Sequence, residues 1–154
     1  RAGREGARTN AVHYAGIMGH YVGDGSQPLH LTIHYNGWAD NTPNPNEYTK
    51  DRKLHGRFEI GFLEAAIELS SVKPKVMPPK PLADVFDSVR KYLAETFAEV
   101  APLYELEKSG EFQPEHPRPK GTEFVSSEIA RAATMLGDLW VTAWRESGET
   151  AAPR

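Results

Sequence analysis

Hydrophobic residues recur at helical spacing in four stretches of the chain, and no stretch alternates as convincingly as a strand would. The pattern predicts helices over residues 9–22, 51–71, 82–109 and 123–146, with an interruption at Pro102 in the third. The predicted fold class is therefore all-α, a helical domain of about four main helices.

The segments between these helices are rich in proline, glycine and asparagine, which favour turns over regular structure. They cover residues 31–50, 73–81 and 109–120, and the first is long enough to belong to a binding site. Residues 1–7 are charged and rich in glycine. We expect these residues and the tail, residues 149–154, to be loosely ordered.

Two of the predicted helices have a clear packing side. In the second, Leu54, Phe58 and Phe62 begin a stripe that Ala65 and Leu69 continue. In the third, the stripe consists of Val85, Phe86, Val89, Leu93, Phe97 and Val100. Both stripes are expected to face a common core.

Composition narrows the class of protein. The 154 residues are 39% hydrophobic and 25% charged with a net charge of -3, which fits a single globular domain, residues 1–154. This charge excludes the basic field that drives non-specific binding to nucleic acid. No apolar run is long enough to span a bilayer, and Arg1 does not begin a signal-peptide pattern. Without cysteine, any metal must be held by histidine and carboxylate ligands.

Two short segments concentrate side chains that bind metal ions. In HYVGDGSQPLH, His20 and Asp24 have i, i+4 spacing and His30 follows a Gly/Pro turn. In LHGRFE, His55 and Glu59 repeat the i, i+4 spacing. Residues four apart share a helix face, so each pair can present two ligands to one ion. This ligand set is typical of hydrolytic zinc sites, and it predicts a zinc hydrolase.

The remaining candidates have weaker signals. His34 follows His30 by four residues in a stretch that reads as extended, so it is not expected to be a ligand. His13 shares the helix face of His20 and could lie in the core or behind the ligands. Tyr35 and Trp38 could form an aromatic wall for a substrate or cap the core. His116 lies among prolines and is expected to be exposed.

Other catalytic signatures are missing from the sequence. It contains no Walker loop, no GxGxxG motif after a strand, no GxSxG elbow and no HExxH motif. The two histidine and carboxylate segments are therefore the main chemical signal.

The run HYVGDGSQPLH followed by LHGRFE resembles the superfamily of zinc-dependent bacterial phospholipases C and single-strand-specific nucleases of fungi and plants. That superfamily is α-helical, holds three zinc ions in a cleft and hydrolyses phosphoester bonds. The resemblance covers mainly residues 10–65. Glu59 in place of aspartate looks like the phospholipase branch, whereas the long interval before His55 looks like the nuclease branch.

The resemblance implies a role for each ligand. His20 would bind the first zinc of a close pair, and Asp24 would also reach the third zinc. His30, His55 and Glu59 would hold the remaining zinc. Asp24 and Glu59 would be the carboxylates that position the activated water.

The resemblance also implies that part of the site lies elsewhere. Members of the superfamily have an N-terminal amine and further histidine and aspartate ligands upstream, so the chain looks like the C-terminal portion of a longer fold. Up to three zinc ions are expected in the complete fold, and one fully liganded site in this chain. Association with an upstream segment and an extracytoplasmic location, periplasmic or secreted, follow as expectations.

The expected function is that of a zinc-dependent phosphodiesterase or other phosphoester hydrolase acting on a phospholipid or on single-stranded nucleic acid. Two alternatives remain open. The chain could be a truncated or divergent member that binds zinc structurally without catalysis, or a metal-free helical module that binds a partner.

Overall fold

The computed structural model describes residues 2–148, so the predicted loose tail lies outside the described residues. Its elements are α1 (Ala2–Asp24), a 3-10 helix (Pro28–Leu31), α2 (Leu54–Gly56), a π-helix (Arg57–Phe62), α3 (Leu63–Ala66), α4 (Leu69–Val72), a second 3-10 helix (Lys73–Lys75), α5 (Val85–Ala98), α6 (Val100–Lys108) and α7 (Pro119–Glu146). Within residues 2–148 there is no strand, only an isolated bridge. The all-α prediction is confirmed.

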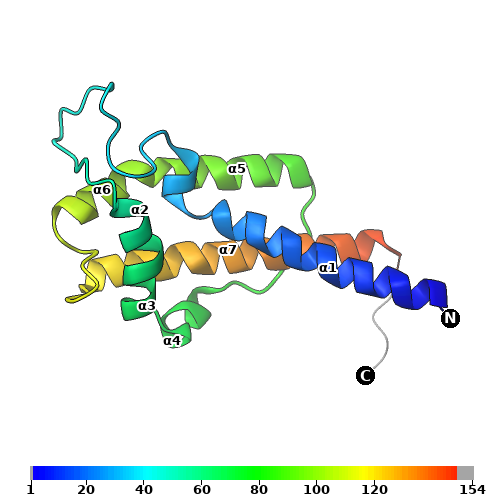
Figure 1. Ribbon diagram of the computed structural model, residues 1–154. Helices are drawn as coiled ribbons and strands as arrows, with labels where there is room; N and C mark the ends of the chain where they lie inside the picture. The colour runs from blue at the N-terminus through cyan, green and yellow to red at the C-terminus, as the bar shows by residue number, and fades with distance from the viewer. Residues whose placement is uncertain (1, 149–154) are drawn as a thin grey trace.

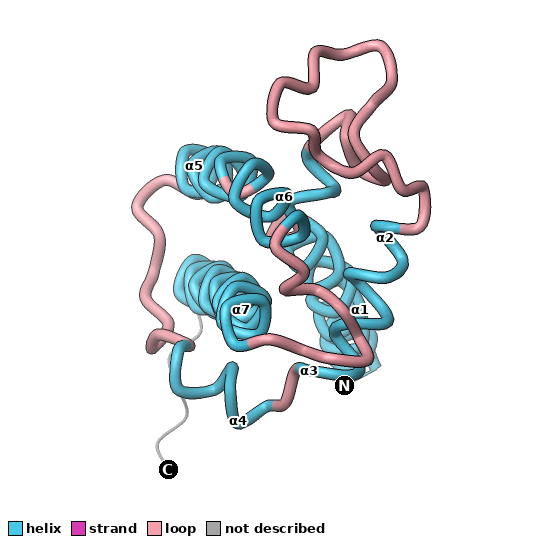
Figure 2. The backbone as a smooth tube through the Cα atoms, turned by 90° about the vertical axis from the view of Figure 1, so that its left-hand side faces the viewer, coloured by secondary structure: helices cyan, strands magenta, loops and turns pink. Residues whose placement is uncertain are grey.

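Helices α1, α5 and α7 run along the length of the molecule, and α1 and α5 both contact α7 (Figure 1). The short helices α2, α3 and α4 cross one end, beside the start of α7. Seen from that end, the loop that precedes α2 extends above α6 and α2 (Figure 2). No helix among the described residues is both long and apolar enough to cross a bilayer.

Helix α1 is longer than predicted, and the prediction that residues 1–7 are loosely ordered is wrong from Ala2 onward. This stretch contains no proline, and alanine, arginine and glutamate favour a helix enough to offset its glycines. Much of α1 faces outward, since Val12, Tyr14 and Tyr21 are 68%, 67% and 70% exposed. The helix therefore exposes apolar side chains on more than one side.

The second predicted helix is continuous only from Leu54 to Ala66. At Ile67 the backbone becomes extended (φ -107°, ψ 120°), and the Ile67 side chain packs against the core. Leu69 then belongs to the separate helix α4 and is 74% exposed, so the predicted stripe is wrong beyond Phe62. The inner face of Leu54, Phe58 and Phe62 is confirmed.

The third predicted helix divides at Glu99 into α5 and α6. Pro102 causes this break because its ring would collide with the carbonyl of Ala98, four residues earlier. Helix α5 buries Tyr92 and Thr96, whereas Phe86 is 81% exposed. The stripe predicted for this helix is therefore only partly right.

A cluster of aromatic and aliphatic side chains forms the core behind α2 and the π-helix. Phe112 is fully buried and makes edge contacts with the rings of Phe58 and Phe62 at centroid distances of 4.9 and 5.3 Å. Leu103 and Tyr104 of α6 are also fully buried in this cluster. The segment with the sequence LHGRFE is thus fixed from behind by core packing.

Residues 76–84, which complete the linker before α5, form no helix, but α7 holds them in place. Backbone N–H groups of Met77, Lys80 and Leu82 donate to side-chain oxygens of Thr134, Asp138 and Thr142, which are four residues apart on α7. Prolines occupy positions 78, 79 and 81 between these donors. The non-proline amides therefore find partners on α7 although the segment is irregular.

Glu128 predicts a pH dependence of stability. Burial raises the pKa of Glu128 to about 7, against the opposing effect of the neighbouring Arg131, and the charge of Glu99 also raises it. The folded chain therefore holds a proton that the unfolded chain releases, so the free energy of unfolding falls as pH rises from about 4.5 to about 7. We expect Glu128→Gln to be more stable than the wild type by about 2–3 kcal/mol at pH 8.

At pH 5 the two proteins should differ little, since the wild-type carboxyl is then largely protonated in the folded state. Urea unfolding at both pH values in the presence of a chelator measures the difference without interference from metal. Parallel pH profiles for the two proteins would contradict this prediction.

Candidate metal centre

The turn after α1 presents His30. The side-chain Oε1 of Gln27 accepts the Leu29 N–H at 2.8 Å and caps the 3-10 helix. Pro28 occupies the first helical position, and Leu29 is fully buried as an anchor. A Cβ on Gly25 would lie 3.0 Å from the ring of Tyr92, so this close approach favours glycine. The turn therefore has a fixed place on α5.

The structure brings together three of the five predicted ligands. His30 Nε2 lies 3.3 Å from His55 Nε2 and 3.6 Å from Glu59 Oε2, and His55 Nε2 lies 2.6 Å from Glu59 Oε2. These three residues are the single group of potential metal ligands among residues 2–148. Their side chains are 26%, 24% and 39% exposed, so an ion could enter and retain an open coordination position.

Hydrogen bonds fix the ring orientation of both histidines. His55 Nδ1 lies 3.0 Å from the carbonyl oxygen of Tyr35, and His30 Nδ1 lies 3.3 Å from that of Asp24. A carbonyl only accepts, so Nδ1 is the donor in each hydrogen bond and Nε2 is the ring nitrogen that faces the centre. This is the arrangement that metal-binding histidines usually show.

The shortest contact in this group requires a proton or a metal ion between its two atoms. His55 Nε2 and Glu59 Oε2, at 2.6 Å, cannot both remain acceptors without a shared proton or metal ion. Two ligands of a tetrahedral zinc ion lie about 3.3 Å apart, given zinc-to-ligand distances of about 2.0–2.1 Å. The two longer separations are close to this value, and the 2.6 Å contact would have to widen. The three residues therefore fit zinc.

The pair His20 and Asp24 lies behind this group. Their i, i+4 contact exists, with 3.3 Å between His20 Nε2 and Asp24 Oδ2. Asp24 Oδ1 is 3.6 Å from His30 Nδ1, on the side of the ring that faces away from the centre. The His20 side chain is 72% exposed, and no third ligand joins the pair within residues 2–148.

The other histidines do not approach the centre. His34 stacks on Trp38 with 3.6 Å between ring centroids, and its Nδ1 accepts the Ala39 N–H. Burial lowers the pKa of His34. His13 is exposed on α1 and contacts Tyr14, and His116 is exposed in its loop as predicted.

The two predicted substrate aromatics have different environments. Tyr35 is 57% exposed, and its ring makes an edge contact with the ring of His55 at 6.2 Å. Trp38 packs against the core, with Tyr48 and Tyr104 beside it and His34 stacked on its ring. Trp38 caps the core and does not form a wall of the site. Tyr35 lines a cavity together with His30 and His55.

A cavity of 540 Å³ opens beside the histidines. This volume is in the range of small-molecule sites. The cavity combines the polar groups of Asp24, His30 and His55 with a largely apolar surround. That surround includes Tyr21, Leu31, Tyr35 and Leu93.

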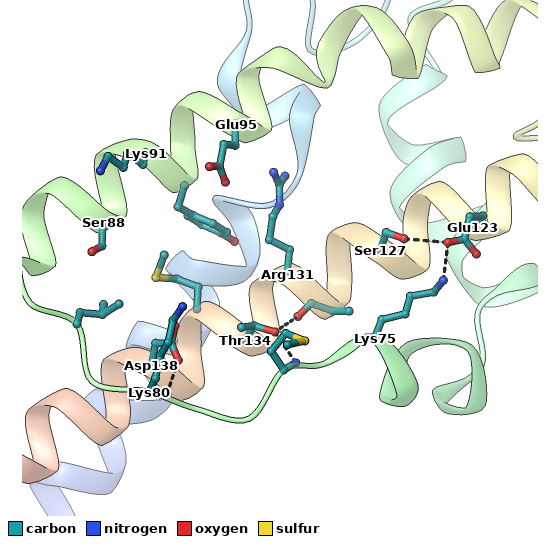
Figure 3. A pocket seen from close by; sticks show the side chains of 15 residues that line it. Lys75, Lys80, Ser88, Lys91, Glu95, Glu123, Ser127, Arg131, Thr134 and Asp138 are labelled. Atoms are coloured by element: carbon teal, nitrogen blue, oxygen red, sulfur yellow. Dashed lines mark hydrogen bonds and ion pairs between the residues drawn. The ribbon is translucent and has the colours of Figure 1, made fainter.

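A second cavity of 580 Å³ lies between α5, α7 and the linker (Figure 3). Several of its charged groups neutralise one another: Lys75 bonds Glu123 across its rim, and Lys91 bonds Asp87. Arg131 is bonded to Glu128 and to Thr96. No group of potential metal ligands occurs in it among the described residues. The cavity contains charges of both signs, and several of them pair with one another, so they do not indicate which class of ligand could bind.

Sequence reasoning missed the groups that hold the ligands. Asn36 Oδ1 accepts the backbone N–H of His55 at 3.1 Å, next to the carbonyl of Tyr35 that accepts the ring proton. Arg57, between His55 and Glu59 in sequence, turns inward to Glu107. The Asn-Gly pair at residues 36 and 37 marks a turn, but the pairing of that turn with α2 has no sequence signal.

Comparisons of the chain with protein-family models, with curated proteins and with solved structures found no match. A proposal for the function of the site therefore rests on its geometry and on the sequence motifs that carry its ligands.

Proposed function

We propose that the chain binds one zinc ion through His30, His55 and Glu59 and acts in the zinc-dependent hydrolysis of phosphoester bonds. The observation that carries this proposal is the convergence of two Nε2 atoms and one carboxylate oxygen within 3.6 Å of one another. Both rings are oriented by carbonyl groups on their far sides. The sequence resemblance to zinc-dependent phospholipases C and single-strand-specific nucleases supports the reaction class.

Zinc in this place would polarise a phosphoryl oxygen and lower the pKa of bound water to about 7. The residues of the chain supply binding and orientation. Tyr35 and Tyr21 expose aromatic rings at the adjacent cavity, where they can stack on a flat group or cover an acyl chain. Leu31 and Leu93 line the same cavity and would give a bound phosphoester apolar contacts.

The proposal includes an association with a further segment that supplies additional zinc ligands. His20 and Asp24 form a contact pair without a third ligand among residues 2–148. Val12 and Tyr21 expose apolar surface on the same helix. A segment that covers α1 beside His20 and Asp24 would bring its own ligands to these two residues.

Zinc stoichiometry tests the proposal. We expect elemental analysis of the zinc-loaded, desalted chain to give about one zinc per chain, as one three-residue site predicts. Glu59→Gln and His55→Ala should each weaken zinc binding by more than about 100-fold, beyond the effect of changing an outer hydrogen bond. The control is His116→Ala, which removes an exposed histidine from a loop and should retain the metal. Full zinc content in both site variants would contradict the proposal.

The alternative of zinc binding without catalysis is favoured by one observation, the presence of a single three-ligand group in the described chain. Hydrolysis of bis(p-nitrophenyl) phosphate by the chain loaded with one zinc distinguishes the two functions. Turnover that chelation abolishes and zinc restores supports the hydrolase. A stoichiometric zinc with no turnover supports a structural metal.

A further inference from the structure

His55 donates two hydrogen bonds to consecutive residues of the preceding loop. The carbonyl oxygen of Tyr35 accepts the Nδ1 proton of its ring at 3.0 Å. The side-chain Oδ1 of Asn36 accepts its backbone N–H at 3.1 Å. One short piece of loop therefore holds both the main chain and the ring of the same residue, from 19 positions away in the sequence.

The backbone contact replaces a missing helix cap. His55 is the second residue of α2, where an N–H has no partner within its own helix. The N-cap residue, Lys53, provides no capping side chain, and the nearby Asp51 accepts the Lys53 N–H instead. Asn36 accepts the N–H that an N-cap side chain would normally accept. The orientation of the first turn of α2 thus depends on a residue outside it.

The loop is itself well anchored, so the loop fixes the position of His55 and not the reverse. The Trp38 N–H donates to Thr49 at 2.7 Å, immediately beyond Asn36. Gly37 has φ +82°, and a Cβ there would lie 2.7 Å from the backbone of Lys50. On the other side, the hydroxyl of the buried Tyr104 donates to the carbonyl of His34 at 2.5 Å. Residues 34–38 are therefore held between α6 and the segment that leads into α2.

We propose that Asn36 is a positioning residue for the metal ligand His55. Its amide oxygen fixes the backbone of His55 while the adjacent Tyr35 carbonyl fixes the tautomer and tilt of the ring, and together they direct Nε2 toward His30 and Glu59. This inference rests on the proposed zinc site. Loss of an outer hydrogen bond of this kind typically lowers metal affinity by about 10–100-fold.

The test compares three variants of the whole chain. Asn36→Ala removes the amide oxygen that accepts the His55 N–H, whereas Asn36→Asp puts a carboxylate oxygen in the place of that amide oxygen. Asn44→Ala is the matched control, because Asn44 bonds the backbone N–H and carbonyl of Tyr48 in the same loop and has no contact with His55. Zinc affinity is measured by competition with a chromophoric chelator, ligand geometry by the visible spectrum of the cobalt(II) form, and stability by thermal unfolding of the metal-free chain.

We expect Asn36→Ala to bind zinc about 10–100-fold more weakly and to change the cobalt spectrum, and Asn36→Asp to restore most of both. Asn44→Ala should lower the unfolding temperature while leaving affinity and spectrum near those of the wild type. Wild-type affinity in Asn36→Ala would overturn the inference and leave the zinc site intact. Equal loss of affinity in Asn44→Ala would overturn it in favour of general loop integrity. A wild-type chain that takes up no zinc would overturn both this inference and the proposed function.

Discussion

Replacing Arg57 by methionine is expected to lower the free energy of unfolding by about 3–5 kcal/mol. The Arg57 guanidinium donates two hydrogen bonds to Glu107, at 2.7 and 3.1 Å, and the Glu107 side chain is only 7% exposed. These bonds raise the pKa of Arg57. Without Arg57, the Glu107 carboxylate would remain buried and uncompensated, which costs more than the pair itself contributes.

The double variant Arg57→Met/Glu107→Met should recover much of this loss, because two apolar side chains of similar length leave no buried charge. Arg52→Met is the control, since Arg52 pairs with the exposed Asp40 and should leave the unfolding midpoint near the wild type. Urea unfolding of the metal-free chain measures all four proteins. A double variant as unstable as Arg57→Met would show that packing, rather than the unpaired carboxylate, sets the cost.

Phe112→Ala is expected to cost about 3–5 kcal/mol in the free energy of unfolding. Phe112 is fully buried, and its ring contacts Phe58 and Phe62 on the inner side of the helix that carries His55 and Glu59. Truncation removes these contacts and leaves a cavity behind that helix.

The same substitution at Phe86 is the control for Phe112→Ala. Phe86 is 81% exposed on α5, so Phe86→Ala should change the free energy of unfolding by less than about 0.5 kcal/mol. Thermal and urea unfolding of both variants give the comparison. Similar losses of stability at the two positions would mean that burial of Phe112 in the core does not set the cost of its truncation.

The approach of His55 and Glu59 could be predicted from sequence because it depends on spacing within one helix. Four residues place both side chains on one face, and the structure gives 2.6 Å between their ligand atoms. The approach of His30 is less local, and the prediction relied on the sequence resemblance to bring it to His55. The structure places their Nε2 atoms 3.3 Å apart.

Core capping by Trp38 was one of two expectations from sequence, but its contact with Tyr104 could not be predicted because Tyr104 lies far along the chain. Tyr104 contacts Trp38 from α6, and nothing near Trp38 in the sequence indicates that contact. The predicted end of the second helix was wrong for a related reason. The spacing of Leu69 continues the stripe of Phe62, but tertiary packing of Ile67 ends the helix first. Periodicity identified the buried face that α2 shares with the π-helix, but it did not show where the helical segment ends.

The proline-rich linker between α4 and α5 has a mechanical consequence for the site. Its prolines restrict the backbone, and three side chains of α7 accept hydrogen bonds from the amides of Met77, Lys80 and Leu82. The linker is therefore held along α7 and has little freedom to bend. The linker therefore fixes the chain that enters α5 against α7, and Leu93 of α5 lines the cavity beside the histidines. The loop that carries Tyr35 is anchored as well, so the cavity beside the histidines lies between two walls that are each held by long-range hydrogen bonds.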